Sequence, residues 1–503
     1  MADSSVNIMR GASLLVLDTS LSAFVGIIAF ALISRLISRS EMGVMTALLL
    51  LTSTLQLVSS LGLPNAATKF ISEALAVENT AAAAAVASYA IKTTLVAAFT
   101  SSTLCFAFSG VLSNLLLGTA RQYQLLQVLA FNIFFASLIP VLTGVLLGLK
   151  RLREIAIFGV SSFCLQQTLV VLLLLCHYGL FGVVVGWVVG NFFNFIASAM
   201  LIIRSLNLSE PNRVDLRVLL RYSWPLYPVA FVSLLDNWFD RALFIGHSLS
   251  ELGVYNVAYK AFGYFYAMPI VVSDALFPHF SELRSREGLD RLSSAFKSTS
   301  RYLALIVTPL ALGGAALAWP LIRLFAGRGY AAAAQPLSVL CVFSAVSAIG
   351  LVLGKILLVL GETRGYSLTI FSTVLAGFAI GKLLVPLMGP LGASFARAAS
   401  MLLALPPMLV VTSKKIRIRV DGEAIWKSWT AGVVMSAVFF LLQCVSEDAL
   451  LLPVYLAIGT ATYVLVLRSL HAIEEKDLEF ARRFLGLRPD GAILSLLRRV
   501  LIP

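Results

Sequence analysis

Long uninterrupted runs of apolar residues limit the folds open to this chain more than any other feature. A helix needs about 20 apolar residues to cross the hydrocarbon core of a bilayer. With 59% hydrophobic and 13% charged residues, the chain has too little polar surface to enclose a soluble core. We therefore predict an all-α polytopic membrane protein with about 14 transmembrane helices, near residues 11–34, 42–63, 82–107, 123–148, 155–176, 180–203, 222–246, 252–277, 302–325, 334–360, 366–387, 390–412, 426–445 and 450–468.

Short segments recur about 210 residues apart. SEMGV at residues 40–44 returns as SELGV at residues 250–254, and the GLFG corner at residues 179–182 returns as GPLG at residues 389–392. Such spacing predicts two parallel structural copies, and transporters built from repeats bind their substrates between the copies. We expect a six-helix lobe at residues 1–206, a second at 207–415, two additional transmembrane helices at 416–470 and a cytoplasmic amphipathic tail at 471–503.

The basic residues are unevenly distributed over the connections. With a cytoplasmic N-terminus, 27 of the 38 Lys and Arg residues lie in inside loops and ends, against five outside and six within spans. The positive-inside rule then places both termini in the cytoplasm of a cell membrane protein. The net charge of +13 is explained by topology and by contact with lipid headgroups. No loop is long enough to form a nucleic-acid-binding domain, so we expect no nucleic acid partner.

Residue patterns of enzymes and metal sites are missing from the sequence. The five cysteines form no CxxC pair, and the four histidines have no second ligand at metal spacing. The Gly-Lys pairs at residues 354–355 and 381–382 lack the hydroxyl residue of a phosphate-binding loop. We expect no enzyme activity, no metal and no cofactor.

Charged residues inside the predicted spans are the candidate functional residues. A charge at the bilayer centre costs about 2.5–3.5 kcal/mol on insertion scales, so it normally faces a partner or a water-filled cavity. A structural ion pair between spans seven and eight explains part of this set as well as a ligand site does. In the functional interpretation, cations attract phosphate and tyrosine rings suit sugars. Candidates for the substrate cavity are Arg241, Lys260, Arg397, Tyr255 and Tyr259, and candidates for ion coupling or positioning are Asp18, Asp236 and Asp240.

Several motifs together resemble a known family. The segment at residues 33–73 with its EMGV corner, RYSWPLYP at 221–228, ELGVYNVAYK at 251–260, LGETR at 360–364 and GPLGA at 389–393 resemble polysaccharide biosynthesis flippases of the MOP superfamily. The resemblance covers about residues 10–470 and lies in the order and spacing of the motifs. It implies two six-helix lobes around a central cavity, alternating access, and export of a polyprenyl-diphosphate-linked oligosaccharide or polysaccharide repeat unit.

Two related classes are alternatives. A cation-coupled multidrug or toxin extruder would carry a proline with the aspartate of its first span, and here Asp18 has no such proline. A peptidoglycan lipid-precursor flippase would have an arginine-rich first helix, and residues 11–34 contain no basic residue. The expected partners are the lipid-linked oligosaccharide, membrane lipids, H⁺ or Na⁺ as coupling ion, and glycosyltransferases or a polymerase of the same pathway.

Overall fold

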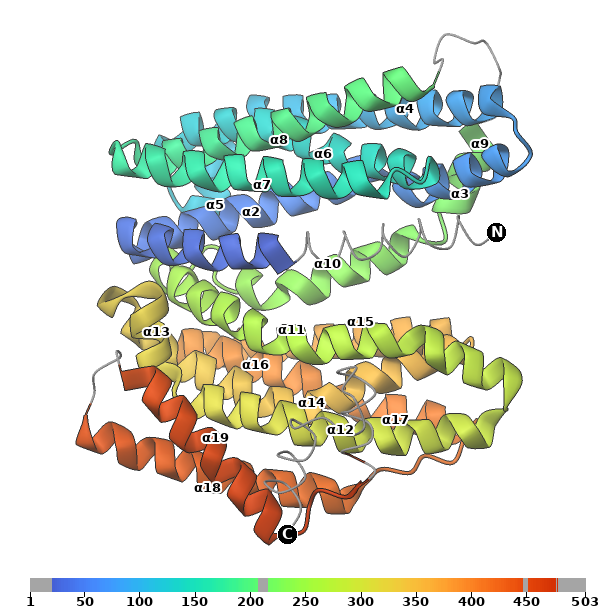
Figure 1. The fold of residues 1–503 in the computed structure, drawn as a ribbon. Coiled ribbons are helices and arrows are strands. Elements are labelled where there is room, and N and C mark those ends of the chain that lie inside the picture. The colour runs from blue at the N-terminus through green and yellow to red at the C-terminus, as the bar shows by residue number, and fades with distance from the viewer. Residues whose placement is uncertain (1–19, 207–215, 447–450, 476, 478–503) are drawn as a thin grey trace. The chain divides into compact units, whose positions relative to one another are not determined.

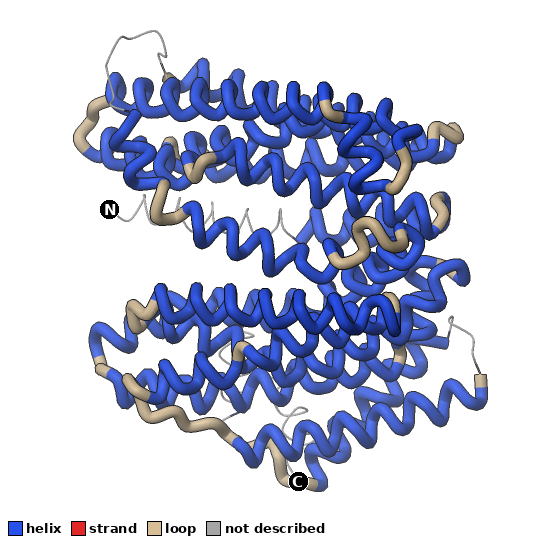
Figure 2. The backbone as a smooth tube through the Cα atoms, turned by 180° about the vertical axis from the view of Figure 1, so that it is seen from behind, coloured by secondary structure: helices blue, strands red, loops and turns tan. Residues whose placement is uncertain are grey.

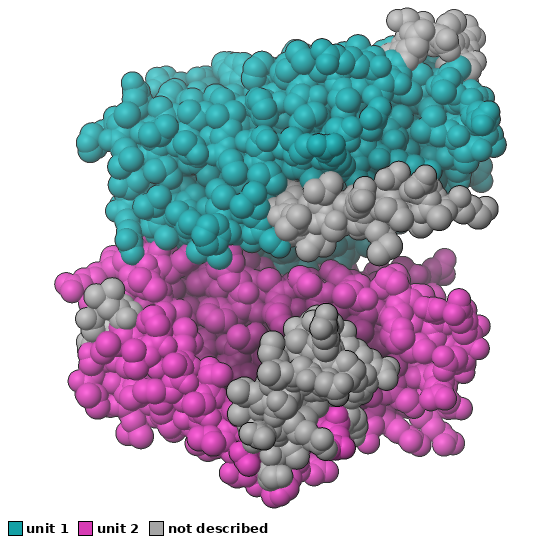
Figure 3. Space-filling view, in the orientation of Figure 1, with its two compact units in different colours: residues 1–253 teal, residues 254–503 magenta. Residues whose placement is uncertain are grey.

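The computed structural model describes residues 20–206, 216–446, 451–475 and 477 (Figure 1). These residues form helices and short connections, with no strand among them (Figure 2). The chain divides into two compact units, unit 1 at Met1–Gly253 and unit 2 at Val254–Pro503 (Figure 3). Asp18 lies outside the described residues, as does most of the predicted tail at 471–503.

Helical segments occur at all fourteen positions where spans are predicted. Among the described residues, eleven helices are long and apolar enough to cross a membrane. Two further positions hold bent pairs, Arg217–Ser223 with Tyr227–Ala242 at 45° and Leu289–Ala316 with Ala318–Ala326 at 75°. The shorter apolar helix Ser20–Leu36 occupies the first position. The all-α polytopic fold predicted from hydropathy is confirmed.

Unit 1 is built around helix α6, which contacts α2, α3, α4 and α8. Its buried core is formed mainly by Leu, Val, Ile and Ala side chains of α3, α4 and α6. The helices of this unit after Ser20–Leu36 are α2 Arg39–Ser60, α3 Leu63–Ala76, α4 Thr80–Ala107, α5 Ser109–Leu117, α6 Tyr123–Gly148, α7 Leu152–Leu175, α8 Gly179–Ser205, α9 Leu216–Ser223 and α10 Tyr227–Ala242, with a 3₁₀ turn η1 at Ala120–Gln122.

Helix α11, Leu249–Arg286, begins in unit 1 and continues through unit 2. Within unit 2, α14 contacts α12, α16 and α17. Of the last two helices, α18 packs against α12 and α19 packs against α18. The remaining elements are α12 Leu289–Ala316, α13 Ala318–Ala326, the 3₁₀ turn η2 Arg328–Ala333, α14 Ala334–Val359, α15 Thr363–Met388, α16 Pro390–Leu403, α17 Leu405–Ser413, α18 Gly422–Val445 and α19 Leu452–Ser469.

The internal repeat is visible in the lengths of the elements. Helices α4 and α12 each have 28 residues, α5 and α13 each have 9, and α6 and α14 each have 26. The contacts α4 with α6, α6 with α8 and α7 with α8 recur as α12 with α14, α14 with α16 and α15 with α16. The same local sequence pattern therefore produces the same order of elements twice, while α18 and α19 have no counterpart. The division at residues 206 and 415 stays a prediction.

The clearest copy is the helix start that contains the repeated SExGV motif. Helix α2 begins at Arg39 and α11 begins at Leu249, 210 residues later. Ser38 caps α2 by accepting from the Glu41 amide at 3.3 Å, and Ser248 accepts from the Glu251 amide at 3.3 Å. A side-chain oxygen at this position satisfies an amide that the first helical turn leaves without an intrahelical partner.

The two copied helix starts cross at their glycines. A Cβ atom on Gly43 would overlap the carbonyl oxygen of Leu249, and one on Gly253 would overlap that of Arg39. All four residues belong to unit 1. The crossing is reciprocal, because Arg39 and Leu249 correspond in the repeat, as do Gly43 and Gly253. Glycine is required at both positions because the backbones approach each other too closely for any side chain.

The ninth span differs from its prediction. The sequence places it at residues 302–325 and treats residues 284–301 as a loop, whereas α12 already begins at Leu289 and ends at Ala316. Most of the predicted loop is helical, since α11 continues to Arg286 and α12 begins at Leu289. Charges at helical spacing support this, as in the pair between Arg286 and Glu282 on α11 at 2.8 Å. The second half of the predicted span is the separate helix α13.

Candidate functional site

The last turn of α10 carries two charged residues, Asp240 and Arg241, within unit 1. Asp240 is fully buried and Arg241 is 5% exposed, and their charged groups lie 3.5 Å apart. The Arg241 guanidinium stacks over the ring of Trp238 at 4.0 Å and donates to the carbonyl of Asn237. An arginine suits this position because the carbonyl end of a helix is electronegative. Arg241 thus lies where it can compensate the Asp240 carboxylate within one helix.

Aromatic rings form a continuous row along one face of α11 in unit 2. Ring centroids are 6.2 Å apart from Tyr255 to Tyr259, 6.1 Å from Tyr259 to Phe262, and 5.1 Å from Phe262 to Tyr266. Steps of three and four residues place all of them on the same helical face. The hydroxyl of Ser347 on α14 donates to the Tyr266 hydroxyl at 3.4 Å. The row therefore combines ring faces with hydroxyl groups inside an apolar span.

Arg397 brings a positive charge to this row. It lies on α16 and is only 3% exposed, and its guanidinium is 5.5 Å from the Tyr259 ring centroid. An arginine over an aromatic face is stabilised electrostatically, more strongly when both groups are removed from water. Arg397 and Tyr259 were chosen from the sequence for depth and residue type, and the structure brings the two together.

The other predicted site residues differ in exposure. Tyr255 is fully buried, whereas Lys260 is exposed and Asp236 and Tyr259 are half-buried. Asp236 precedes Asp240 by one helical turn on α10, as the spacing predicts. The surface-accessible part of the candidate set is thus Asp236, Tyr259 and Lys260.

An apolar groove of about 610 Å³ opens in unit 2. Five helices line it, α11, α12, α13, α18 and α19, with side chains such as Phe265, Leu310, Leu321, Met435 and Leu456. Its lining is almost entirely hydrocarbon, with Thr460 and Tyr463 as the polar exceptions. A groove of this chemistry takes alkyl or isoprenoid chains in preference to a hydrated group.

Comparison with known families gives one match. The model of the family described as "Polysaccharide biosynthesis protein" matches residues 32–335. The chain belongs to the polysaccharide biosynthesis protein family. A search of curated protein sequences finds no match.

Solved structures give the fold of this family member. The chain is similar to the lipid II flippase MurJ in an inward closed conformation, with a TM-score of 0.73, 14% identity, and coverage of 94% of this chain and 99% of that one. It is also similar to an inward-facing multidrug resistance MATE family transporter of the MOP superfamily, with a TM-score of 0.65, 14% identity, and coverage of 78% and 94%. A third match, with a TM-score of 0.54, is a MOP superfamily transporter from Pyrococcus furiosus, at 14% identity and 86% and 95% coverage. The protein therefore has the MOP transporter fold and is a multi-pass membrane protein.

One ion pair of this protein was not predicted from the sequence. Asp274 on α11 and Lys355 on α14 form an ion pair at 2.5 Å in unit 2. Neither residue is among the candidates chosen from the sequence. A signal was present, because an aspartate within a predicted span requires a partner.

Proposed function

We propose that this protein is a flippase that moves a polyprenyl-diphosphate-linked oligosaccharide or polysaccharide repeat unit across the cytoplasmic membrane by alternating access. The observation that carries the proposal is the contact between Arg397 and the aromatic row of α11. A buried guanidinium attracts phosphate and donates several hydrogen bonds to its oxygens. Tyrosine faces and hydroxyls suit sugars, whose surfaces alternate C–H and O–H groups.

The apolar groove supports the lipid part of the same substrate. In this proposal the isoprenoid chain lies against α11, α12, α18 and α19, and the polar head is held by the cations. A drug-like cation would be attracted to carboxylates and repelled by Arg397 instead. MurJ matches a larger share of this chain, 94%, than the MATE transporter does, at 78%. That difference concerns the extent of the fold, whereas the charge of Arg397 favours a lipid-linked substrate over a multidrug substrate, with the peptidoglycan precursor as the alternative lipid-linked cargo.

Coupling and positioning roles are proposed for the remaining candidates. Asp236 and Asp240 on α10, together with Asp18, are the carboxylates that would bind H⁺ or Na⁺. Arg241 and Lys260 are the further cations that would compensate the diphosphate during passage. Dispersed cations suit transport because a substrate held by one strong clamp would not be released. In this role the protein performs no covalent chemistry, and pathway glycosyltransferases or a polymerase would act before or after it.

Reconstitution tests the proposal. Purified protein in proteoliposomes is given a polyprenyl-diphosphate oligosaccharide with a labelled sugar, and appearance of the label on the far leaflet is measured with an impermeant glycosidase. We expect Arg397→Ala to lower the translocation rate at least tenfold, Arg397→Lys to lower it less, and Tyr259→Phe to keep part of it. The matched control is Lys382→Ala, since Lys382 also lies over an aromatic ring, Phe378 at 5.6 Å, but is exposed. Equal rates for wild type and Arg397→Ala would refute the role of Arg397, and no wild-type translocation would refute the function.

The proposed orientation, with both termini in the cytoplasm, has a separate test. A single cysteine at Lys414, in the basic loop before α18, is introduced into a cysteine-free protein and exposed to an impermeant thiol reagent on intact cells. We expect no labelling until the cells are permeabilised. Native Cys444, exposed near the other end of α18, is restored alone as the positive control. Labelling of the Lys414→Cys protein on intact cells would reverse the orientation.

A further inference from the structure

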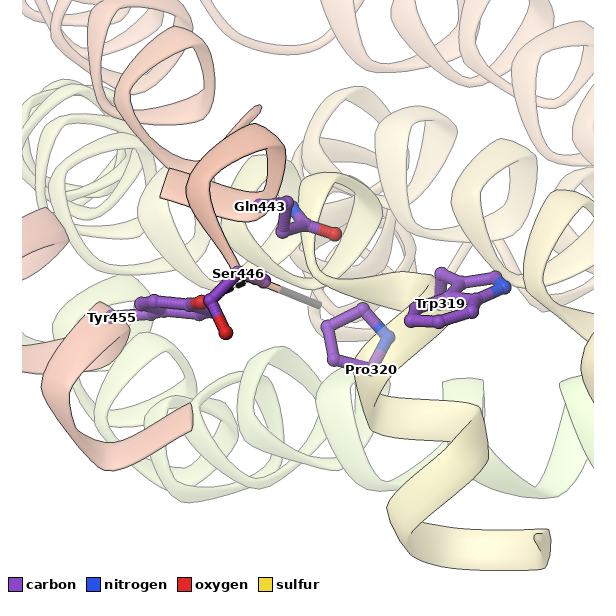
Figure 4. Close-up of a pocket in the computed structure, with 5 residues that line it drawn as sticks. All are labelled: Trp319, Pro320, Gln443, Ser446 and Tyr455. Atoms are coloured by element: carbon purple, nitrogen blue, oxygen red, sulfur yellow. Dashed lines mark hydrogen bonds between the residues drawn. The ribbon is translucent and has the colours of Figure 1, made fainter. Parts of the chain in front are cut away.

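A small polar pocket in unit 2 lies apart from the aromatic row of α11. It has a cavity volume of about 260 Å³ and is lined by Trp319, Pro320, Gln443, Ser446 and Tyr455 (Figure 4). These residues come from α13, from the C-terminal end of α18 and its cap, and from the first turn of α19. The basic loop at residues 414–427 leads into the opposite end of α18. The pocket therefore lies at the end of the spans away from that loop.

The hydrogen bonds that the lining residues already make determine which of their polar atoms can bind a ligand. Gln443 donates from Nε2 to the carbonyls of Ala316 at 3.0 Å and Phe439 at 3.1 Å, which uses both amide hydrogens. Its Oε1 accepts no hydrogen bond from the described part of the chain, and Figure 4 shows it directed toward the side of Trp319. The Tyr455 hydroxyl gives its hydrogen to the Ser446 carbonyl at 2.6 Å. Both side chains thus present oxygen atoms that only accept, and a ligand must supply the donors.

An aromatic ring lines the pocket, and a positive charge lies beside that ring. The Trp319 indole is partly exposed at the pocket, and the Arg323 guanidinium stacks on it at 4.4 Å. An indole face attracts polarised C–H groups as well as cations, because its π-system is electron-rich. The position of Arg323 adds a positive charge beside the pocket, which favours a ligand that carries an acidic group.

The pocket is not a by-product of the internal repeat. Trp319 is the second residue of α13, and the second residue of the corresponding helix α5 is Gly110. A Cβ atom on Gly110 would meet nothing within 4 Å. Gln443 and Tyr455 belong to α18 and α19, which have no counterpart in unit 1. The combination of an indole with two acceptor oxygens is therefore a feature of the second copy and its additional helices.

We propose that this pocket binds a single sugar ring, with acidic sugars preferred. Hydroxyl groups would donate to Gln443 Oε1 and Tyr455 Oη, while the C–H face of the ring would lie on Trp319. The cavity volume of about 260 Å³ suits one ring, and we expect that ring to be a terminal sugar. Two sources have this chemistry: the glycan of the transported substrate, in which case the inference rests on the proposed function, and the headgroup of a membrane glycolipid.

Binding is tested on the purified full-length protein in nanodiscs of phosphatidylcholine. The probes are methyl glycosides of glucose, N-acetylglucosamine and glucuronic acid, observed by saturation-transfer NMR. We expect transfer from the wild type, strongest for the glucuronide, and at least a threefold loss in Trp319→Ala. The matched control is Trp426→Ala, because Trp426 is an exposed tryptophan near the other end of α18. It should leave the transfer unchanged.

Tyr455→Phe separates binding from folding, because it removes one acceptor and leaves the ring. A twofold or greater loss of transfer at an unchanged melting temperature would support the pocket. No transfer from the wild type with any glycoside, or equal transfer from the wild type and Trp319→Ala, would overturn it.

The source of the sugar is distinguished by two further measurements on Trp319→Ala. Slower translocation of the labelled oligosaccharide in proteoliposomes identifies the substrate glycan. Loss of co-purifying glycolipid at an unchanged translocation rate identifies a lipid headgroup. Glycoside binding by a protein that translocates nothing would keep the pocket and refute the flippase function, whereas translocation without glycoside binding would refute the pocket alone.

Discussion

Helices α4 and α12 are the same element of the repeat, and they differ in what covers them. Each has 28 residues, so positions correspond at an offset of 209. In α4, one face exposes large apolar side chains, as a helix facing lipid does. In α12 the same face is covered, because α18 packs against it. Three exposed side chains of unit 1 correspond to buried residues of unit 2. Phe99 is 64% exposed and its counterpart Thr308 is 1% exposed, and Phe108 is 55% exposed and its counterpart Leu317 is 1% exposed. Leu104 is 52% exposed, and its counterpart Gly313 is buried.

The two helices also carry a cation at the same position. Lys92 of α4 is exposed, and its counterpart Arg301 of α12 is 5% exposed. Arg301 pairs with Asp421 at 3.3 Å, Glu474 at 2.9 Å and Asp477 at 2.8 Å, and donates to the Ala472 carbonyl at 2.7 Å. The comparison shows how the additional helix pair is held in place. The face of α4 that exposes apolar side chains corresponds to a protein contact in α12, and the exposed cation of α4 corresponds to a buried cross-link from α12 to the segment after α19.

The largest effect is expected from removing this cross-link. Arg301→Met leaves the buried Asp477 carboxylate, 8% exposed, without its arginine. Breaking a buried ion pair by removing one partner costs about 3–5 kcal/mol. We expect a large fall in the melting temperature of the detergent-solubilised protein and faster proteolysis after α19.

Lys92→Met is the matched control for this change and should shift the melting temperature little. If the two variants melted alike, Arg301 would not be the attachment point, and the apolar contact of α18 with α12 would have to supply the stability by itself.

A smaller effect is expected from the apolar contact. A Cβ atom on Gly432 of α18 would lie 2.7 Å from Leu312 Cδ1 and 3.1 Å from Thr308 Cγ2. Gly432→Leu should therefore push α18 away from α12 and cost about 1–3 kcal/mol, as overpacking does. Gly110→Leu in α5 places the same side chain where nothing lies within 4 Å. A thermal melt in which Gly110→Leu lost as much stability as Gly432→Leu would contradict the difference between covered and uncovered faces.

The smallest effect on stability is expected from Asp421 and depends on pH. Burial alone would raise the pKa of Asp421, but hydrogen bonds from the Ala424 amide and Arg301, with the charges of Arg301 and Lys297, outweigh it and lower this pKa below its usual range. A lowered carboxyl pKa stabilises the fold at pH values above the unfolded pKa of about 3.9, and the contribution is lost as the pH falls through the folded value.

We therefore expect Asp421→Asn to lower the melting temperature modestly at pH 6, with the gap to the wild type narrowing toward pH 3. Glu423→Gln is the control, because its carboxylate pairs with Lys427 but is 71% exposed. A gap that stayed constant between pH 6 and pH 3 would show that Asp421 acts as a helix cap without its charge.

Features set by local sequence could be predicted, and features set by distant contacts could not. Each span is a continuous apolar run, so its position follows from the residues within it. The Arg301 cluster joins residues 120 and 176 positions apart, and nothing near Arg301 indicates those partners. Its neighbours Arg291 and Lys297 made the segment resemble a basic loop.

The candidate site divides in the same way. Depth in the membrane singled out Arg397, because buried charge is costly wherever it occurs, and residue type singled out Tyr259 as an aromatic ring suited to sugars. The pocket at Trp319 could not be found from sequence, because it depends on the 75° bend between α12 and α13 and on two helices outside the repeat.

The reciprocal glycine crossing of α2 and α11 has an evolutionary consequence. A mutation that enlarges Gly43 is opposed by the backbone at Leu249, and one that enlarges Gly253 is opposed by the backbone at Arg39. Neither copy of this helix start can change its glycine by itself, because any side chain there would meet the backbone of the other copy. In chains that keep this crossing, both positions should therefore remain glycine, and the pair should mark the point where the two copies stay alike.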